Sequence, residues 1–324
     1  MARESQMPGH GRRGMRKRQS EKGFILTDEA SIEMELERLL PGVREALEAL
    51  LSFDTTPKGA DHEACTRWLE GRLSALGFDC QLHRPIDEAP ALLEAHRPAR
   101  GMGGHVVMYG HYDVTSRLHG THGGPTQAPV LLERDGRWWG QGVSDNKGAL
   151  TARLVALALI EDTPALTWFI QGEEETGSSA ARRIMGKRLP GIEADLWLDE
   201  TGYHDHEDGT LRLIARKIGP ERTGSEPPDV ALQALIDSLG QLAGCWGISA
   251  RLEVRGLNKA AVLGGCPFNQ SLPVGARYFA LGVNDSHSRI HDANESVPLW
   301  TFPLHAEELR AVFQWIKQLP FRGA

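Results

Sequence analysis

The sequence has few cysteines and no long apolar run. Its four cysteines, Cys65, Cys80, Cys245 and Cys266, are scattered through 324 residues and lack the C-x-x-C spacing of a thiolate zinc site or a redox motif. We therefore expect a reducing, cytoplasmic setting. No stretch approaches the roughly 18 apolar residues that a membrane helix needs. Because 40% of the residues are hydrophobic, we expect a soluble globular protein with a substantial buried core.

Acidic residues outnumber basic ones outside the first 22 residues. That segment carries seven Lys/Arg, two acids and almost no large apolar side chains, so we expect a disordered basic tail. A nucleic-acid-binding arm and a true start at Met15 are the alternatives, since no apolar region follows to make a secretory signal. The rest of the chain has 29 basic and 41 acidic residues, a formal charge of −12. Such a body is a poor nucleic-acid binder.

Short apolar strands alternate with helices along the chain. Helical spacing predicts helices, and apolar runs too short for a helix predict strands. The expected helices cover 28–51, with a break at Pro41, then 61–76, 147–162, 228–242 and 304–319, and the expected strands cover 78–83, 104–109, 165–171, 194–198, 248–254 and 276–282. The alternation predicts an α/β fold in which helices flank a mostly parallel central sheet.

Histidines and carboxylates follow several of these strands. In open α/β sheets, ligands bind beyond the carboxyl ends of the strands. Three carboxylates directly after a buried strand are costly unless cations neutralise them, and zinc favours imidazole and carboxylate ligands. The sequence therefore predicts a metal site at the sheet edge, built from the polar residues His111, Asp113, Asp145, Glu173, Glu174, Glu175, Asp199 and His291.

Five sequence blocks carry these residues in a fixed order. They are GHYDV at 110–114, WGQGVSDNKG at 139–148, EEETGS at 173–178, DET at 199–201 and HDANE at 291–295. In this order they resemble the motifs of the acetylornithine deacetylase, succinyl-diaminopimelate desuccinylase and glutamate carboxypeptidase family of di-zinc metallopeptidases. Several blocks in sequence are far more specific than one. The resemblance implies a three-layer, zinc-exopeptidase-like fold.

The resemblance also implies a role for each site residue and two bound Zn²⁺ ions, for which Co²⁺ or Mn²⁺ are possible substitutes. Carried over position by position, it makes Glu174 the general base, Asp113 the residue that orients a ligating histidine, and Asp145 the bridging ligand, with His111, Glu175, Asp199 and His291 as the other metal ligands. Two positions stay open, because Glu200 could replace Asp199 and His287 lies close to His291. The Asn294-Glu295 pair favours His291.

The chain departs from the family pattern after Asp199. The family inserts a lid and dimerisation domain there, but the segment from Gly202 to Pro228 has only 27 residues, and an independent domain seldom forms from fewer than about 50 residues. We expect a loop or hairpin at 202–228, a single catalytic domain over 23–324, an open site, and a monomer or a dimer unlike the family's. An oxyanion donor must then come from within that domain, where the candidates are Arg277, Asn294, His204, His206 and His287.

The function expected from the resemblance is hydrolysis of an amide bond, as in a peptidase, a dipeptidase or an N-acyl amino-acid deacylase. Zinc would activate a water molecule, and Glu174 would accept its proton. The open site suggests an alternative, a biosynthetic tailoring enzyme acting on a bulky or carrier-bound acyl amide. A non-catalytic metal-binding homologue is the third interpretation, but it would have no use for the base Glu174. No nucleic-acid or membrane partner is expected.

Overall fold

The computed structural model describes residues 29–85, 89–116, 131–200, 203–205, 210–219, 225–226, 228–253 and 271–320. The basic segment 1–22, Cys266 and His206 lie outside these ranges. Within the described residues, no helix is both long and apolar enough to cross a membrane.

A large mixed sheet organises the described chain. Its main path runs β1-β2-β6-β3-β7-β12-β9-β8-β13, and β10 and β11 also pair with β9. The strands of this sheet are β1 (Asp79–His83), β2 (Leu92–Arg97), β3 (Gly101–His111), β6 (Thr163–Gln171), β7 (Leu196–Asp199), β8 (Tyr203–Asp205), β9 (Thr210–Ile218), β10 (Ser225–Glu226), β11 (Ser249–Glu253), β12 (Arg277–Ala280) and β13 (Asn284–Asp285). A smaller sheet contains β4 (Leu132–Arg134), β5 (Arg137–Trp139) and β14 (Ser296–Pro298).

The centre of the large sheet is parallel, as the alternating pattern predicts. Strands β6, β3, β7 and β12 run in one direction, and β1, β2 and β9 add antiparallel pairings on either side. The central strands are buried on both faces: Val106 and Met108 of β3 belong to one core cluster, and Val107 and Tyr109 belong to the other. Strands buried on both faces need near-continuous apolar runs. Such runs are recognisable in the sequence, and these strands could therefore be predicted.

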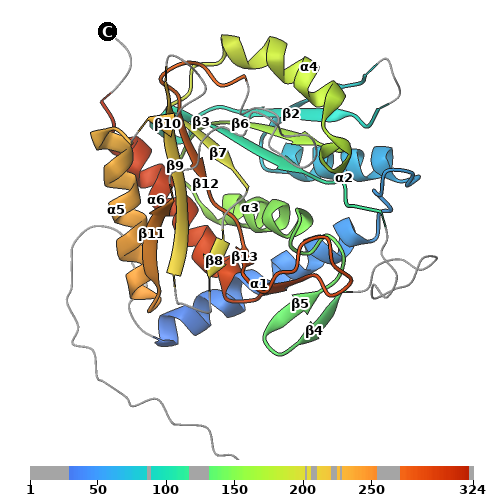
Figure 1. Ribbon diagram of the computed structural model, residues 1–324, viewed down its shortest axis with the longest axis horizontal. Coiled ribbons are helices and arrows are strands. Elements are labelled where there is room, and N and C mark those ends of the chain that lie inside the picture. Colours follow the sequence, from blue (N-terminus) through green and yellow to red (C-terminus); the bar gives the residue numbers. More distant parts are fainter. Residues whose placement is uncertain are drawn as a thin grey trace, which may run out of the picture.

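Helices cover both faces of the sheet (Figure 1). On one face lie α1 (Glu29–Leu51), α2 (His62–Ala75), α3 (Lys147–Leu159), α5 (Val230–Cys245) and α6 (Thr301–Gln318), and on the other lies α4 (Ser179–Arg188). Large side chains such as Phe302 and Trp168 fill the first core cluster, while Met185 of α4 packs in the second. The three-layer α/β fold is therefore confirmed.

Helix α1 corrects one prediction. Pro41 was expected to separate two helices, but it lies inside a single helix, Glu29–Leu51. A proline in a helix interior removes a hydrogen bond and costs about 3 kcal/mol. Burial offsets this cost, because Leu39, Val43 and Leu47 are completely buried in the core on the two sides of Pro41.

The segment between β7 and α5 extends the central sheet. Strand β9 pairs with β12 and with β8, both antiparallel, and alternate side chains of β9 join the two cores, Leu213 and Ala215 on one face and Ile214 on the other. A nine-residue strand in the middle of the sheet was not expected in this segment. The described residues of 202–228 therefore contribute to the sheet itself.

Candidate metal centre

Asp145 lies between the two predicted histidine ligands. Its Oδ1 is 3.0 Å from His111 Nε2, and its Oδ2 is 3.1 Å from His291 Nε2. His111 ends β3, whereas His291 follows β13 in a turn where its φ is +63°. One carboxylate thus presents one oxygen to each imidazole, although the three residues are far apart in sequence.

Asp113 links His111 to the acidic turn after β6. His111 Nδ1 lies 3.2 Å from the backbone carbonyl oxygen of Asp113 and 3.3 Å from one of its carboxylate oxygens. The other carboxylate oxygen accepts the backbone N–H of Glu175 at 3.0 Å. Burial alone would lower the pKa of His111, but the hydrogen bonds to Asp113 and Asp145 outweigh burial and raise this pKa well above its ordinary value. The pocket around His111 therefore favours positive charge.

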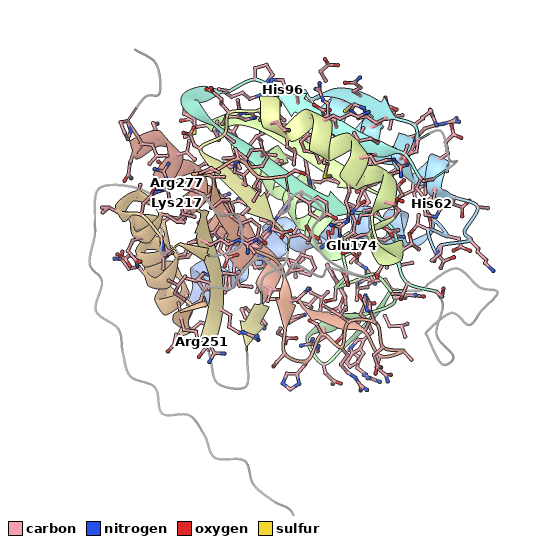
Figure 2. All side chains as sticks on the ribbon, turned by 45° about the horizontal axis from the view of Figure 1, so that its top comes forward. His62, His96, Glu174, Lys217, Arg251 and Arg277 are labelled. Atoms are coloured by element: carbon pink, nitrogen blue, oxygen red, sulfur yellow. The ribbon has the colours of Figure 1, made fainter. Side chains whose placement is uncertain are left out.

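The three consecutive glutamates at 173–175 lie in three different environments. Glu175 points toward His291, with 3.0 Å between Glu175 Oε2 and His291 Nε2. Glu174 is 7% exposed, and burial, together with neighbouring carboxylates, raises its pKa to about 7. Glu173 accepts the backbone N–H of Ala181 in the first turn of α4. Figure 2 shows Glu174 near the middle of the molecule, and ligand atoms of Asp145, Glu175 and His291 lie within 4.8 Å of one another.

The acid closest to His111 at the end of β7 is Glu200. Its Oε1 lies 4.0 Å from His111 Nε2. Asp199, by contrast, accepts the backbone N–H of Glu200 at 2.9 Å on one oxygen and the hydroxyl of Tyr278 on the other. We expected Asp199 to face the metal site. In the structure, Glu200 is the acid of this pair that faces His111. The reason is the pleat of β7, which turns Asp199 toward the sheet face that holds Tyr278 and leaves Glu200 beyond the strand end.

The loop that carries Asp145 is held from behind by Glu295. The carboxylate of Glu295 accepts backbone N–H groups from Gly142, Ser144 and Asp145, at 2.8, 2.8 and 2.9 Å. In the sequence, Glu295 served only to favour His291 over His287 as a ligand, and this contact was not predicted. Nothing in the sequence around Glu295 signals a contact with the loop at 142–145.

The family of the chain follows from comparison with known proteins. A model of the Peptidase family M20/M25/M40 matches residues 107–314, which is more than half of the chain and includes every predicted site residue. The chain belongs to this peptidase family. A metal cofactor is implied by that membership.

Curated relatives match part of this M20 chain. It is 32% identical over 134 residues to cysteinylglycine-S-conjugate dipeptidase of Corynebacterium striatum, covering 37% of the chain and 27% of the relative. It is 39% identical over 89 residues to Beta-Ala-His dipeptidase of Homo sapiens, covering 26% and 17%. A succinyl-diaminopimelate desuccinylase of Paracidovorax citrulli is 32% identical over 151 residues, covering 41% and 36%. The chain therefore matches well under two thirds of the length of these relatives.

Solved structures support the M20 fold. A di-peptidase from Saccharomyces cerevisiae superposes with a TM-score of 0.65 at 12% identity, covering 91% of this chain and 100% of the other. An M20 family metallo-carboxypeptidase from Sulfolobus solfataricus gives a TM-score of 0.64 at 13% identity, covering 84% and 99%. At such low identity the likeness establishes the fold alone.

The donor set of this M20 chain suits divalent cations. Two imidazoles converge with the carboxylates of Asp145, Glu175 and Glu200, the ligand types that zinc and similar ions take. Glu200 is buried, and its Oε2 has no hydrogen-bond partner in the described part of the protein. Burial and the adjacent Asp199 raise the pKa of Glu200 well above its ordinary value. A cation would satisfy this oxygen, so the residues fit the implied metal.

Of the candidate oxyanion donors, Arg277 lies away from this centre. Arg277 is engaged by Asp229, the N-cap residue of α5, with Nε 2.9 Å from Asp229 Oδ2, and Figure 2 shows it beside Lys217, apart from Glu174. His287 and Asn294 are exposed in the loop around His291. The side chain of His204 lies outside the described part of the chain. The source of that donor stays a prediction.

Proposed function

We propose that this M20 chain hydrolyses an amide bond in a small peptide or an N-acyl amino acid, using two divalent metal ions. The observation that carries the proposal is the carboxylate of Asp145, with one oxygen directed to His111 and the other to His291. A carboxylate that faces two histidines in this way suits two adjacent cations better than one. Names of relatives such as dipeptidase and desuccinylase support the same class of substrate.

The proposal gives each residue one task. His111, Asp145 and Glu200 would hold one ion, and Asp145, Glu175 and His291 the other. Bound divalent ions acidify a water molecule and polarise the substrate carbonyl. Glu174 accepts the proton from that water and returns it to the departing nitrogen. The Glu174 side chain is buried at this site, and Asp113 would fix the ring of His111 through Nδ1.

Removal and replacement of metal test this proposal directly. Protein stripped with a chelator should lose hydrolysis of a panel of dipeptides and N-acyl amino acids, and Zn²⁺ or Co²⁺ should restore it, because the site has imidazole and carboxylate donors that accept both ions. Metal analysis of the active protein should give two ions per chain. Full activity in the stripped protein would reject the proposal, and one ion per chain would reject its two-metal form.

The roles of Asp199 and Glu200 can be separated by two isosteric variants. Glu200→Gln should weaken metal binding and lower kcat/KM by at least about tenfold, because a charged ligand is lost. Asp199→Asn should mainly destabilise the fold, by about 1–3 kcal/mol, since it alters buried hydrogen bonds to Tyr278 and Glu200. Chelator competition and urea unfolding of both variants provide the measurements. The opposite ranking in metal affinity would return the ligand role to Asp199.

A bulky or carrier-bound acyl amide is the second candidate substrate. It is supported by the segment 202–228, whose described residues pair in the central sheet through β8, β9 and β10. The proposal therefore includes one catalytic domain over 23–324 without the family's lid, as a monomer or a dimer of another kind. Rates on free N-acyl amino acids and on the same group tethered to a carrier protein distinguish the two candidates. Faster turnover of every free substrate would remove the second.

A further inference from the structure

Glu295 joins the two loops that carry Asp145 and His291. Its Oε1 accepts the backbone N–H groups of both Ser144 and Asp145, and its Oε2 accepts that of Gly142. The side chain is buried, with Glu295 only 3% exposed. Because buried backbone N–H groups need an acceptor, three of them converging on one buried carboxyl group fix the backbone up to Asp145.

The backbone of Glu295 ties the same region to the loop of His291. Its N–H donates to the carbonyl of Asp292, the residue after His291, at 3.1 Å, and its carbonyl accepts the N–H of Gly140 at 3.1 Å. The next residue, Ser296, pairs with Trp139 in the small sheet. Glu295 is therefore held in place by main-chain contacts on both sides while its carboxylate orients the Asp145 loop.

We propose that Glu295 is a positioning residue that holds Asp145 between His111 and His291 and thereby sets the affinity of the site for divalent metal ions. The inference rests on the metal centre of the proposed function. It assigns Glu295 no contact with the metal or the substrate. Its effect passes through the backbone N–H of Asp145, whose side chain must present one oxygen to each histidine.

Loss of the carboxylate has a defined consequence for the loop. Without it, the N–H groups of Gly142, Ser144 and Asp145 lose their buried acceptor, and an unsatisfied buried donor is unfavourable enough to drive a backbone shift. A shift at Asp145 changes the distances from its two oxygens to both histidines. Residues that orient metal ligands typically change metal affinity or activity by 10–100-fold when they are removed, so an effect of this size is expected here.

The test measures metal affinity in the full-length protein. Wild type, Glu295→Ala and Glu295→Gln are stripped of metal, and Zn²⁺ and Co²⁺ are titrated in competition with a chromophoric chelator. Glu295→Ala should bind both ions about 10–100-fold more weakly. Glu295→Gln should bind both ions about three- to tenfold more weakly, because one amide oxygen can still accept the Ser144 and Asp145 N–H groups, while its NH₂ faces the Gly142 N–H.

A matched control separates positioning from general destabilisation. Asp195 is also buried, 8% exposed, and accepts the backbone N–H of His105 at 2.9 Å near the start of β3, far along the strand from His111. Asp195→Ala should lower thermal stability and leave metal affinity within about twofold, because it removes a buried carboxylate that accepts a backbone N–H away from the site.

The outcomes distinguish this inference from the function on which it rests. Wild-type affinity in a folded Glu295→Ala protein, or an equal loss in Asp195→Ala, overturns the positioning role alone. If Glu295→Ala does not fold, unchanged affinity in Glu295→Gln overturns it. A wild-type protein that binds neither ion rejects the proposed function and this inference with it.

Discussion

Glu174→Gln should lower kcat by about 10²–10⁴-fold, the usual contribution of a positioned general base. Glutamine has the same shape but cannot accept a proton from water at neutral pH. The carboxylates that face the Nε2 atoms of the two histidines belong to Asp145, Glu175 and Glu200, so metal content should stay at the wild-type value. Steady-state kinetics on the best substrate of the panel, with metal analysis of the same preparation, measure both quantities.

Glu173→Gln is the control for this variant. Glu173 precedes Glu174 directly but accepts the backbone N–H of Ala181, and a glutamine oxygen can take over that role. Activity should therefore stay within a few-fold of wild type. If Glu174→Gln retains wild-type kcat, another group accepts the proton and the assignment of the base is wrong. If both variants lose activity equally, the effect reflects the turn and not the base.

The ends of the central strands were the predictable part of the site. Strand β3 is a buried run that stops at His111, and β6 is a buried run followed by Gly172 and the acidic triplet. Parallel strands bring their carboxyl ends to one edge, so apolar runs that end abruptly in ligand-type residues predict a shared site. The order of the sequence blocks then predicted the family, and the match of the family model confirmed it.

Directions of single side chains were not predictable from the same information. Asp199 and Glu200 are adjacent, yet the pleat sends one toward Tyr278 and the other toward His111. A motif gives the residue types but leaves the end of the strand uncertain by one residue. A shift of one residue along a strand moves a side chain to the opposite face of the sheet. Pro41 is a second example. The low helix preference of proline predicted a break there, but packing of the neighbouring residues in the core stabilises one continuous helix.

Contacts between loops were also beyond sequence reasoning. The three N–H groups that meet at Glu295 come from a loop about 150 residues earlier, and nothing in local periodicity connects the two. Strand β9 was missed for a different reason. Its segment was treated as the replacement for a missing domain, although its alternate residues Leu211, Leu213 and Ala215 match the spacing of a strand with one face on the core.

Arg137→Ala should lower the free energy of unfolding by about 3–5 kcal/mol, the usual cost of removing one partner from a buried ion pair. Arg137 makes two contacts to Asp285, Nη1 to Oδ2 at 2.6 Å and Nη2 to Oδ1 at 2.8 Å, and the Asp285 side chain is fully buried. Arg137 Nε also donates to Ser296 Oγ at 2.9 Å. The variant would leave a buried carboxylate without its cation. Urea unfolding of the metal-free protein measures the change.

Two comparisons make this result specific. Arg137→Lys should destabilise less than alanine, because a lysine keeps the charge but lacks the planar fork that meets both Asp285 oxygens. Arg67→Ala breaks an exposed pair with Glu63, in which the side chains are 68% and 53% exposed, and should change the free energy of unfolding far less than Arg137→Ala, because solvent screens exposed ion pairs. Equal losses for Arg137→Ala and Arg67→Ala would contradict the buried-pair argument. Because Asp285 also accepts the backbone N–H of His287 in the loop that leads to His291, Arg137→Ala should in addition weaken Zn²⁺ binding, whereas Arg67→Ala should not.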